Sequence, residues 1–432
     1  MIKRILLVTL TFLLLLTPSF ITADNSIAVL DSSVEMHFPV ALVFNLEAES
    51  DFDIVDARLH YQVDRMNYTQ VTSEGWPDFT PAARVATNWI WDMRKSSLPP
   101  GAAVTYWWTI NDAAGNRVET SSNTINFNDI RYDWRSLTEG QITLFWYEGD
   151  DSFAQELMNT CQQGLARLEP IFHNEASRAE MKEPAEVIYR PVKVYVYASA
   201  GDLQEAMVFP QEWTGGVAFT EFSIIVIGIS PGELDWGRGA LVHELTHLVV
   251  HQATFSPYGD LPIWLDEGLA MYNQGELGSY FRGCLDKAIS EDKLISVRSL
   301  CSPFSAETEK ACLSYAESYS LVEYLLAYYG QERMLNLLTL FREGNTYDEA
   351  LMKAYGFDID GFDDRWREAL ASPSTVVVMS QIPGSSGVEA RQYHPALAAV
   401  LSALSASLVL AGALALEDWD WRRLCKKEGN LF

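Results

Sequence analysis

The segment from Ala240 to His251 constrains this chain more than any other stretch. It reads ALVHELTHLVVH, and most of its other side chains are apolar. His243 and His247 are four residues apart, so on an α-helix both imidazoles project from one face. Glu244 follows the first histidine, within reach of a water held between the rings. This H-E-x-x-H spacing is typical of a zinc site that carries its own general base.

A second stretch distinguishes a metal site from two histidines that merely lie in a core. Residues 261–272 read LPIWLDEGLAMY, and nineteen residues separate His247 from Glu267. A catalytic zinc site uses three protein ligands and leaves a fourth position open. Alone, Glu267 would be an ordinary carboxylate in the first turn of a helix. Together with the first motif it predicts a Zn²⁺ centre of His243, His247 and Glu267, with Glu244 as the catalytic base.

The two motifs resemble those of the gluzincin metallopeptidases. The WLDEGLA run is similar to that of the aminopeptidase N family and, more closely, to that of bacterial peptidase MA-like domains. The resemblance covers about residues 130–370 and implies zinc-assisted hydrolysis of a peptide or protein substrate. It also implies a downstream side chain that stabilises the oxyanion. Tyr315 and Tyr319 are the candidates, with Tyr315 preferred, and simple helix packing is the alternative role for both.

The match to this family is incomplete. Many gluzincins carry a carboxylate four residues after the glutamate ligand, where this chain has Met271. We therefore expect the partner of the ligand histidine to be Asp260, Asp266 or a main-chain carbonyl. His251 is expected to support the site or to pack against it. No exopeptidase signature precedes the first motif, which favours an endopeptidase.

Two apolar segments predict export and anchoring. Residues 1–23 have a charged start, an apolar run and a small residue before Asp24, as a cleaved signal peptide does; an uncleaved anchor is the alternative. Residues 395–416 carry no charge and are long enough to cross a bilayer at ~1.5 Å per residue. Basic residues at 422–427 belong on the cytoplasmic side. We expect a single-pass protein of the cell membrane, with its N-terminal domains extracytoplasmic.

Composition divides the chain further. Residues 24–128 contain short runs rich in Val, Ile, Tyr, Trp and Thr between turn residues, which favours an all-β immunoglobulin- or fibronectin-like sandwich. Residues 129–371 combine strands and helices and are expected to form an α+β zincin-like peptidase domain. Residues 372–394, with several Pro, Gly and Ser, are expected to be a juxtamembrane linker. Residues 417–432 form the predicted cytoplasmic tail.

Charge and cysteine content limit the partners. The net charge of −27 argues against nucleic acid, because no basic patch is available to neutralise phosphates. In the predicted sandwich, five aromatic residues are interpreted as core rather than as a carbohydrate-binding face: Trp89, Trp91, Tyr106, Trp107 and Trp108. Four exported cysteines allow three pairings, of which Cys301–Cys312 is favoured. The oligomeric state does not follow from the sequence.

Two functions from different classes remain. The first is a membrane-anchored, extracytoplasmic zinc endopeptidase. The second is a surface binding or adhesion protein that retains zinc without turnover. Glu244 favours the first, because a purely structural metal site has no use for a base. An extended peptide is expected to bind by adding a strand at residues 222–229.

Overall fold

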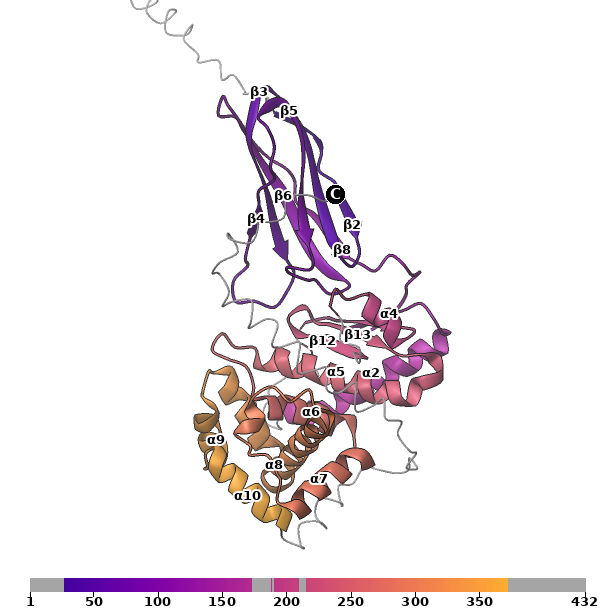
Figure 1. Cartoon of the computed structure of the whole chain (residues 1–432), viewed down its shortest axis with the longest axis vertical. Helices are drawn as coiled ribbons and strands as arrows, with labels where there is room; N and C mark the ends of the chain where they lie inside the picture. Colours follow the sequence, from indigo (N-terminus) through magenta and orange to yellow (C-terminus); the bar gives the residue numbers. More distant parts are fainter. Residues whose placement is uncertain (1–26, 173–187, 189, 210–214, 372–432) are drawn as a thin grey trace, which may run out of the picture.

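The computed structural model describes residues 27–172, 188, 190–209 and 215–371. An N-terminal β domain stands on a domain of sheet and helices (Figure 1). The predicted signal peptide, linker, transmembrane helix and cytoplasmic tail lie outside the described residues. Among the described residues, no helix combines the length and the apolar character that crossing a membrane requires.

The N-terminal β domain is built around one long strand, β3 (Ala41–Val63). The first part of β3 pairs with β1, β2 and β5, and its last part pairs with β4 and β6, so one continuous sheet of eight strands results. The other strands are β1 (Ile27–Asp31), β2 (Val34–His37), β4 (Ser73–Gly75), β5 (Ala82–Asp92), β6 (Ala102–Asp112), β7 (Arg117–Glu119) and β8 (Asn123–Phe127). The pairing of β3 with β5 shifts register between Glu49 and Ile54.

Several aromatic side chains of this domain fill its core. Trp91, Tyr106 and Trp108 are buried beside Phe44 and Leu46. Alternation along β3 and β6 explains the burial of Phe44, Leu46, Tyr106 and Trp108, because successive side chains of a strand point to opposite faces. The interpretation as core is confirmed for Trp91, Tyr106 and Trp108, and Trp89 packs against this core, whereas Trp107 stacks on His60 outside it. A sheet-rich N-terminal region is also confirmed, whereas the immunoglobulin- or fibronectin-like assignment stays a prediction.

The second sheet carries the candidate site. Its order is β12-β13-β11-β10-β9, and β12 is an outer strand that runs antiparallel to β13. The bounds are β9 (Arg135–Glu139), β10 (Ile142–Trp146), β11 (Val192–Tyr197), β12 (Gly216–Phe219) and β13 (Ile224–Gly228). Alternate residues such as Val194 and Ile225 belong to the core shared with the helices, and Tyr195 and Val226 pack on the opposite face. Both faces of the central strands are therefore covered.

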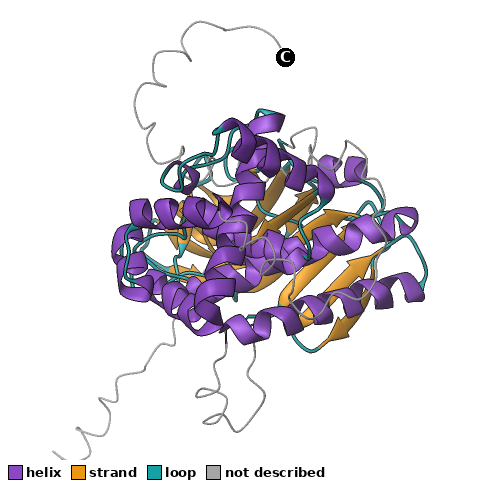
Figure 2. Ribbon diagram, turned by 90° about the horizontal axis from the view of Figure 1, so that it is seen from below, coloured by secondary structure: helices purple, strands orange, loops and turns teal. Residues whose placement is uncertain are grey.

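Helices form the rest of the second domain. They are α2 (Asp151–Phe172), α4 (Ala200–Glu205), α5 (Leu234–Thr254), α6 (Ile263–Gln274), α7 (Ser279–Glu291), α8 (Thr308–Arg342), α9 (Tyr347–Tyr355) and α10 (Ile359–Ala371), with short 3-10 turns η1 (Thr220–Phe222), η2 (Pro231–Glu233) and η3 (Ser299–Cys301). Figure 2, a view from below, shows helices in front of the strands. Gly330, at a φ of 79°, interrupts α8. A capping box of Thr346 and Glu349 starts α9.

The two domains contact each other through backbone and side chains. Lys193 Nζ donates to the carbonyl of Gly101 at 2.9 Å, and the Met66 amide donates to the carbonyl of Glu221 at 2.6 Å. The Tyr68 ring stacks on Phe255, just beyond the end of α5, with ring centres 4.4 Å apart. The β domain is thus held against the end of the helix that bears the first motif.

One cysteine prediction is wrong. The disulfide joins Cys284 of α7 to Cys312 of α8 rather than Cys301 to Cys312. Helices α7 and α8 pack together, which brings the first pair into range. The Cys301 thiol instead donates to the carbonyl of Val297, just before the 3-10 turn η3, at 3.5 Å.

Candidate metal centre

Helix α5 carries the H-E-x-x-H motif, which neighbouring elements bury on all sides. Every residue from Leu241 to Val250 is buried, because the helix lies between the second sheet and helices α2 and α6. His243, Glu244 and His247 are therefore polar groups in an apolar setting. Burial of such groups is costly unless they find partners. The partners of the two histidines come from helix α6, which lies against α5 (Figure 1).

Close packing fixes the position of α6. A Cβ atom at Gly268 would collide with the carbonyl oxygen of Ser318 in α8, so glycine is required immediately after Glu267. On the other side, Asn273 Nδ2 donates to Thr246 Oγ1 at 2.8 Å and to the Gly164 carbonyl at 3.3 Å. These buried bonds join α6 to α5 and α2. Sequence reasoning missed Asn273 and Thr246, although polar residues on two otherwise apolar helices were the available signal.

Three ligand atoms converge at the centre. His243 Nε2 lies 3.2 Å from His247 Nε2, and Glu267 Oε2 lies 3.4 Å from the former and 3.5 Å from the latter. Tetrahedral zinc with bonds of ~2.0–2.1 Å spaces its ligand atoms by about 3.3 Å. The three distances match one face of such a tetrahedron. The residues present therefore fit a zinc ion.

The charge on Glu267 also suits a cation. Burial opposes ionisation of its carboxyl, but contacts with His243 and His247 outweigh burial and hold its pKa below the usual value. All three side chains are buried. Since a metal ligand must be deprotonated, an ionised Glu267 is ready to bind.

Asp266 orients the ligand histidine. Its Oδ1 lies 3.1 Å from Nδ1 of His247, and its Oδ2 lies 3.1 Å from Nε2 of His251. Burial opposes ionisation of this carboxyl, yet the two imidazoles hold its pKa well below the usual range. Of the partners expected from the sequence, Asp266 is the one in contact, and Asp260 is exposed. Met271 packs in the apolar core instead.

Glu244 faces the outer strand of the sheet. The Ala218 amide donates to its carboxyl, and a Cβ at Gly216 would lie 3.2 Å from its Oε1. Its Oε2 has no hydrogen-bond partner among the described residues. Burial raises the pKa of this carboxyl, although the neighbouring histidines act against the rise. One oxygen is thus held by the strand while the other is available to a reacting group.

The strand expected to receive a peptide is a different one. Residues 224–228 form β13, which pairs with β11 on one side and β12 on the other, so the expectation for residues 222–229 is wrong. Strand β12 is the outer one. Because Gly228 donates to the Gly215 carbonyl, the antiparallel pattern turns the backbone groups of Gly216 and Ala218 outward. That edge lies beside Glu244.

The two candidate tyrosines differ in position. Tyr315 is 1% exposed, and burial together with the charges of Glu267 and Glu244 raises its pKa well above the usual value. The Tyr319 hydroxyl instead donates to Glu323 Oε1 at 3.5 Å. The structure therefore brings Tyr315, and not Tyr319, into the electrostatic environment of the centre.

Comparison with known protein families supports the assignment of this site as a metal centre. Residues 177–372 match the family model described as the peptidase MA superfamily. Among curated proteins, no sequence matches this chain.

Two solved structures share limited similarity with the chain. Yeast LTA4 hydrolase in complex with bestatin has 13% identity and a TM-score of 0.32, over 85% of this chain and 69% of that one. A carbohydrate-binding module family 56 β-1,3-glucan binding domain has 16% identity and a TM-score of 0.15, over 23% of this chain and 96% of that one. TM-scores this low do not establish a shared fold.

The matched segment contains His243, Glu244, His247 and Glu267. The part of the chain that carries the site therefore matches the peptidase MA superfamily, a group of the gluzincin metallopeptidases.

Proposed function

We propose that this chain is a membrane-anchored, extracytoplasmic zinc endopeptidase. His243, His247 and Glu267 hold the zinc, and Asp266 fixes the ring of His247. The convergence of the three ligand atoms at 3.2 to 3.5 Å is the observation that carries the proposal. Export and the C-terminal anchor rest on the apolar segments of the sequence, which lie outside the described residues.

The zinc, when bound, would polarise the scissile carbonyl and acidify a water. Glu244 supplies the base: its available Oε2 takes a proton from the attacking water and delivers it to the leaving amine. The raised pKa of its carboxyl suits a group that must also give the proton up. Tyr315 donates a hydrogen bond to the oxyanion that forms at the carbonyl.

An extended peptide binds along β12. Gly216 and Ala218 present outward backbone groups for strand addition, and the strand places the scissile bond next to Glu244. The same Ala218 amide that donates to Glu244 in this structure is one of those groups. The alternative, a zinc-containing surface protein without turnover, leaves the available Oε2 without a role.

The variant Glu244→Gln tests the proposal. We expect it to keep zinc and to lose about 10²–10⁴-fold in hydrolysis of a fluorogenic peptide, the range for general-base catalysis. A peptide acetylated at its N-terminus and amidated at its C-terminus should be cleaved by the wild-type protein, as an endopeptidase requires. Glu276→Gln, an exposed position after α6, is the matched control. Unchanged hydrolysis by Glu244→Gln would reject the mechanism.

A further inference from the structure

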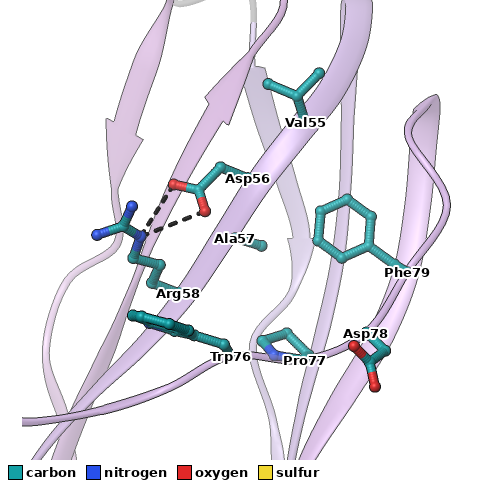
Figure 3. Close-up of a pocket in the computed structure, with 8 residues that line it drawn as sticks. All are labelled: Val55, Asp56, Ala57, Arg58, Trp76, Pro77, Asp78 and Phe79. Carbon is teal, nitrogen blue, oxygen red and sulfur yellow. Dashed lines mark hydrogen bonds and ion pairs between the residues drawn. The ribbon is translucent and has the colours of Figure 1, made fainter.

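A hollow of about 360 Å³ opens on the surface of the N-terminal β domain (Figure 3). Strand β3 contributes Asp56 and Arg58 to its lining, and the segment after β4 contributes Trp76, Asp78 and Phe79. None of the residues of the metal centre takes part. Its volume falls near the lower end of the range for small-molecule sites, about 300 Å³.

Trp76 is the unusual residue of this hollow. It is 69% exposed, whereas Trp91 and Trp108 of the same domain are 7% and 0% exposed in the core. Its Nε1 donates to Glu74 Oε2 at 3.3 Å, and the guanidinium carbon of Arg58 lies 5.7 Å from its ring centre. A large apolar ring is therefore held in one orientation and left open to solvent. A ring fixed in this way loses little conformational freedom when a ligand stacks on it.

Polar groups surround the ring. Asp56 Oδ2 accepts a hydrogen bond from Asn111 Nδ2 at 2.8 Å and lies 3.1 Å from Arg58 Nε. The carboxylate of Asp78 is exposed at the other side of the hollow. Ionised carboxylates accept hydrogen bonds, and the guanidinium donates them. The hollow thus combines a flat apolar surface with fixed donors and acceptors at its margin.

The charges argue against an anionic ligand. A phosphate would meet the carboxylates of Asp56, Glu74 and Asp78 against the single guanidinium of Arg58, so like charges would repel it. A cation would gain less from the indole than at a free ring, because the Arg58 guanidinium already lies over Trp76 and would repel it. A neutral ligand with an apolar face and many hydroxyl groups is repelled by neither the carboxylates nor Arg58, and Trp76 is exposed enough for it to stack.

We propose that this hollow is a carbohydrate-binding site that takes a neutral hexopyranose unit of a polysaccharide. The axial C–H groups of a pyranose form an apolar face, which packs on the Trp76 indole. The equatorial hydroxyls both donate and accept, so they pair with the carboxylates of Asp56 and Asp78 and with Arg58. The site does not depend on the proposed peptidase activity. It would hold the β domain on a glycan surface while the metal centre acts elsewhere.

Titration calorimetry of the full chain with neutral hexasaccharides tests the site. The set comprises cellohexaose, laminarihexaose, maltohexaose and mannohexaose, and any detergent must lack a sugar headgroup. At least one sugar should bind, and Trp76→Ala should weaken it by about tenfold or more, equivalent to ~1.4 kcal/mol. Trp76→Phe should retain part of the affinity. Phe52→Ala is the matched control, because Phe52 is 49% exposed on β3 outside the hollow.

Three results would overturn the proposal. No sugar binds the wild-type protein; Trp76→Ala binds as tightly as wild type while remaining folded by circular dichroism; or hexalysine, rather than any sugar, shows the dependence on Trp76. The last result would identify a site for cationic peptides. The Glu244→Gln variant should bind sugar like wild type, so a failure of the proposed peptidase activity and a failure of this site are distinguishable.

Discussion

The carboxylate of Asp266 lies 3.1 Å from Nδ1 of His247, on the side of the imidazole away from the other ligands. This contact selects the tautomer of His247 that carries its proton on Nδ1, which leaves Nε2 with a lone pair for the metal. The second oxygen of Asp266 contacts His251. A carboxylate between two imidazoles therefore replaces the carboxylate that many gluzincins carry where this chain has Met271.

Asp266→Asn should weaken zinc binding by about 10–100-fold, the usual cost of removing a partner that orients a ligand. The amide keeps the size of the side chain but loses the charge that favours His247 in this orientation. Competition with a chelator of known affinity measures the loss. Asp260→Asn, at the exposed alternative position, should bind zinc like wild type. Equal affinities for both variants would contradict the role of Asp266.

Tyr315→Phe should reduce kcat by about 10²-fold with little change in KM, because a donor to the oxyanion acts only in the transition state. Tyr319→Phe should stay near wild type, since its hydroxyl contacts Glu323 instead. Steady-state kinetics on one fluorogenic peptide compares the two. If the Tyr319 variant lost more activity than the Tyr315 variant, the assignment of the donor would be reversed.

Removal of the disulfide should destabilise the helical part of the protein. The bond between Cys284 and Cys312 spans 28 residues, and closing a loop of this size contributes about 3–4 kcal/mol in the chain-entropy treatment. Cys284→Ser should therefore lower the free energy of unfolding in urea by this order, and a reductant should have the same effect on wild type. Cys301→Ser should change stability much less. Peptide mapping that recovered a Cys301–Cys312 link would refute the pairing.

Glu317 gives the protein a pH-dependent stability. Burial raises the pKa of its carboxyl from 4.5 to about 8 in the folded protein. The folded state then binds more protons than the unfolded chain between these values, so stability falls as pH rises through this window. The contribution is at most about 4–5 kcal/mol, reached above the folded pKa.

Glu317→Gln should remove this fall in stability with rising pH. Its urea midpoint should exceed that of wild type more at about pH 8.5 than at about pH 5, because only the wild-type group must ionise. Glu309→Gln, at an exposed position in the first turn of α8, is the control. A variant whose stability declined with pH as steeply as wild type would exclude Glu317 as the cause.

The parts of the site set by local spacing were predictable from sequence. His243, Glu244 and His247 share one helix, and the period of 3.6 residues alone places them on one face. The cap of α9 at Thr346 and the break in α8 at Gly330 likewise depend only on residues that are close in sequence. Glu267 followed from the number of ligands that zinc requires.

The remaining features depend on contacts between distant elements. Whether Asp260 or Asp266 reaches His247 is decided by how α6 returns along α5, which close packing at Gly268 determines. The disulfide depends on the packing of α7 against α8. The edge position of β12, rather than β13, depends on the strand order of the whole sheet. The sequence near each residue contains none of this information.

The zinc content of the purified full chain tests the central claim most directly. Elemental analysis after exhaustive dialysis should find about one zinc per chain, and Glu267→Gln should lose most of it while Glu276→Gln retains it. A wild-type protein without zinc, or a Glu267→Gln variant with an unchanged zinc content, would contradict the metal centre described here.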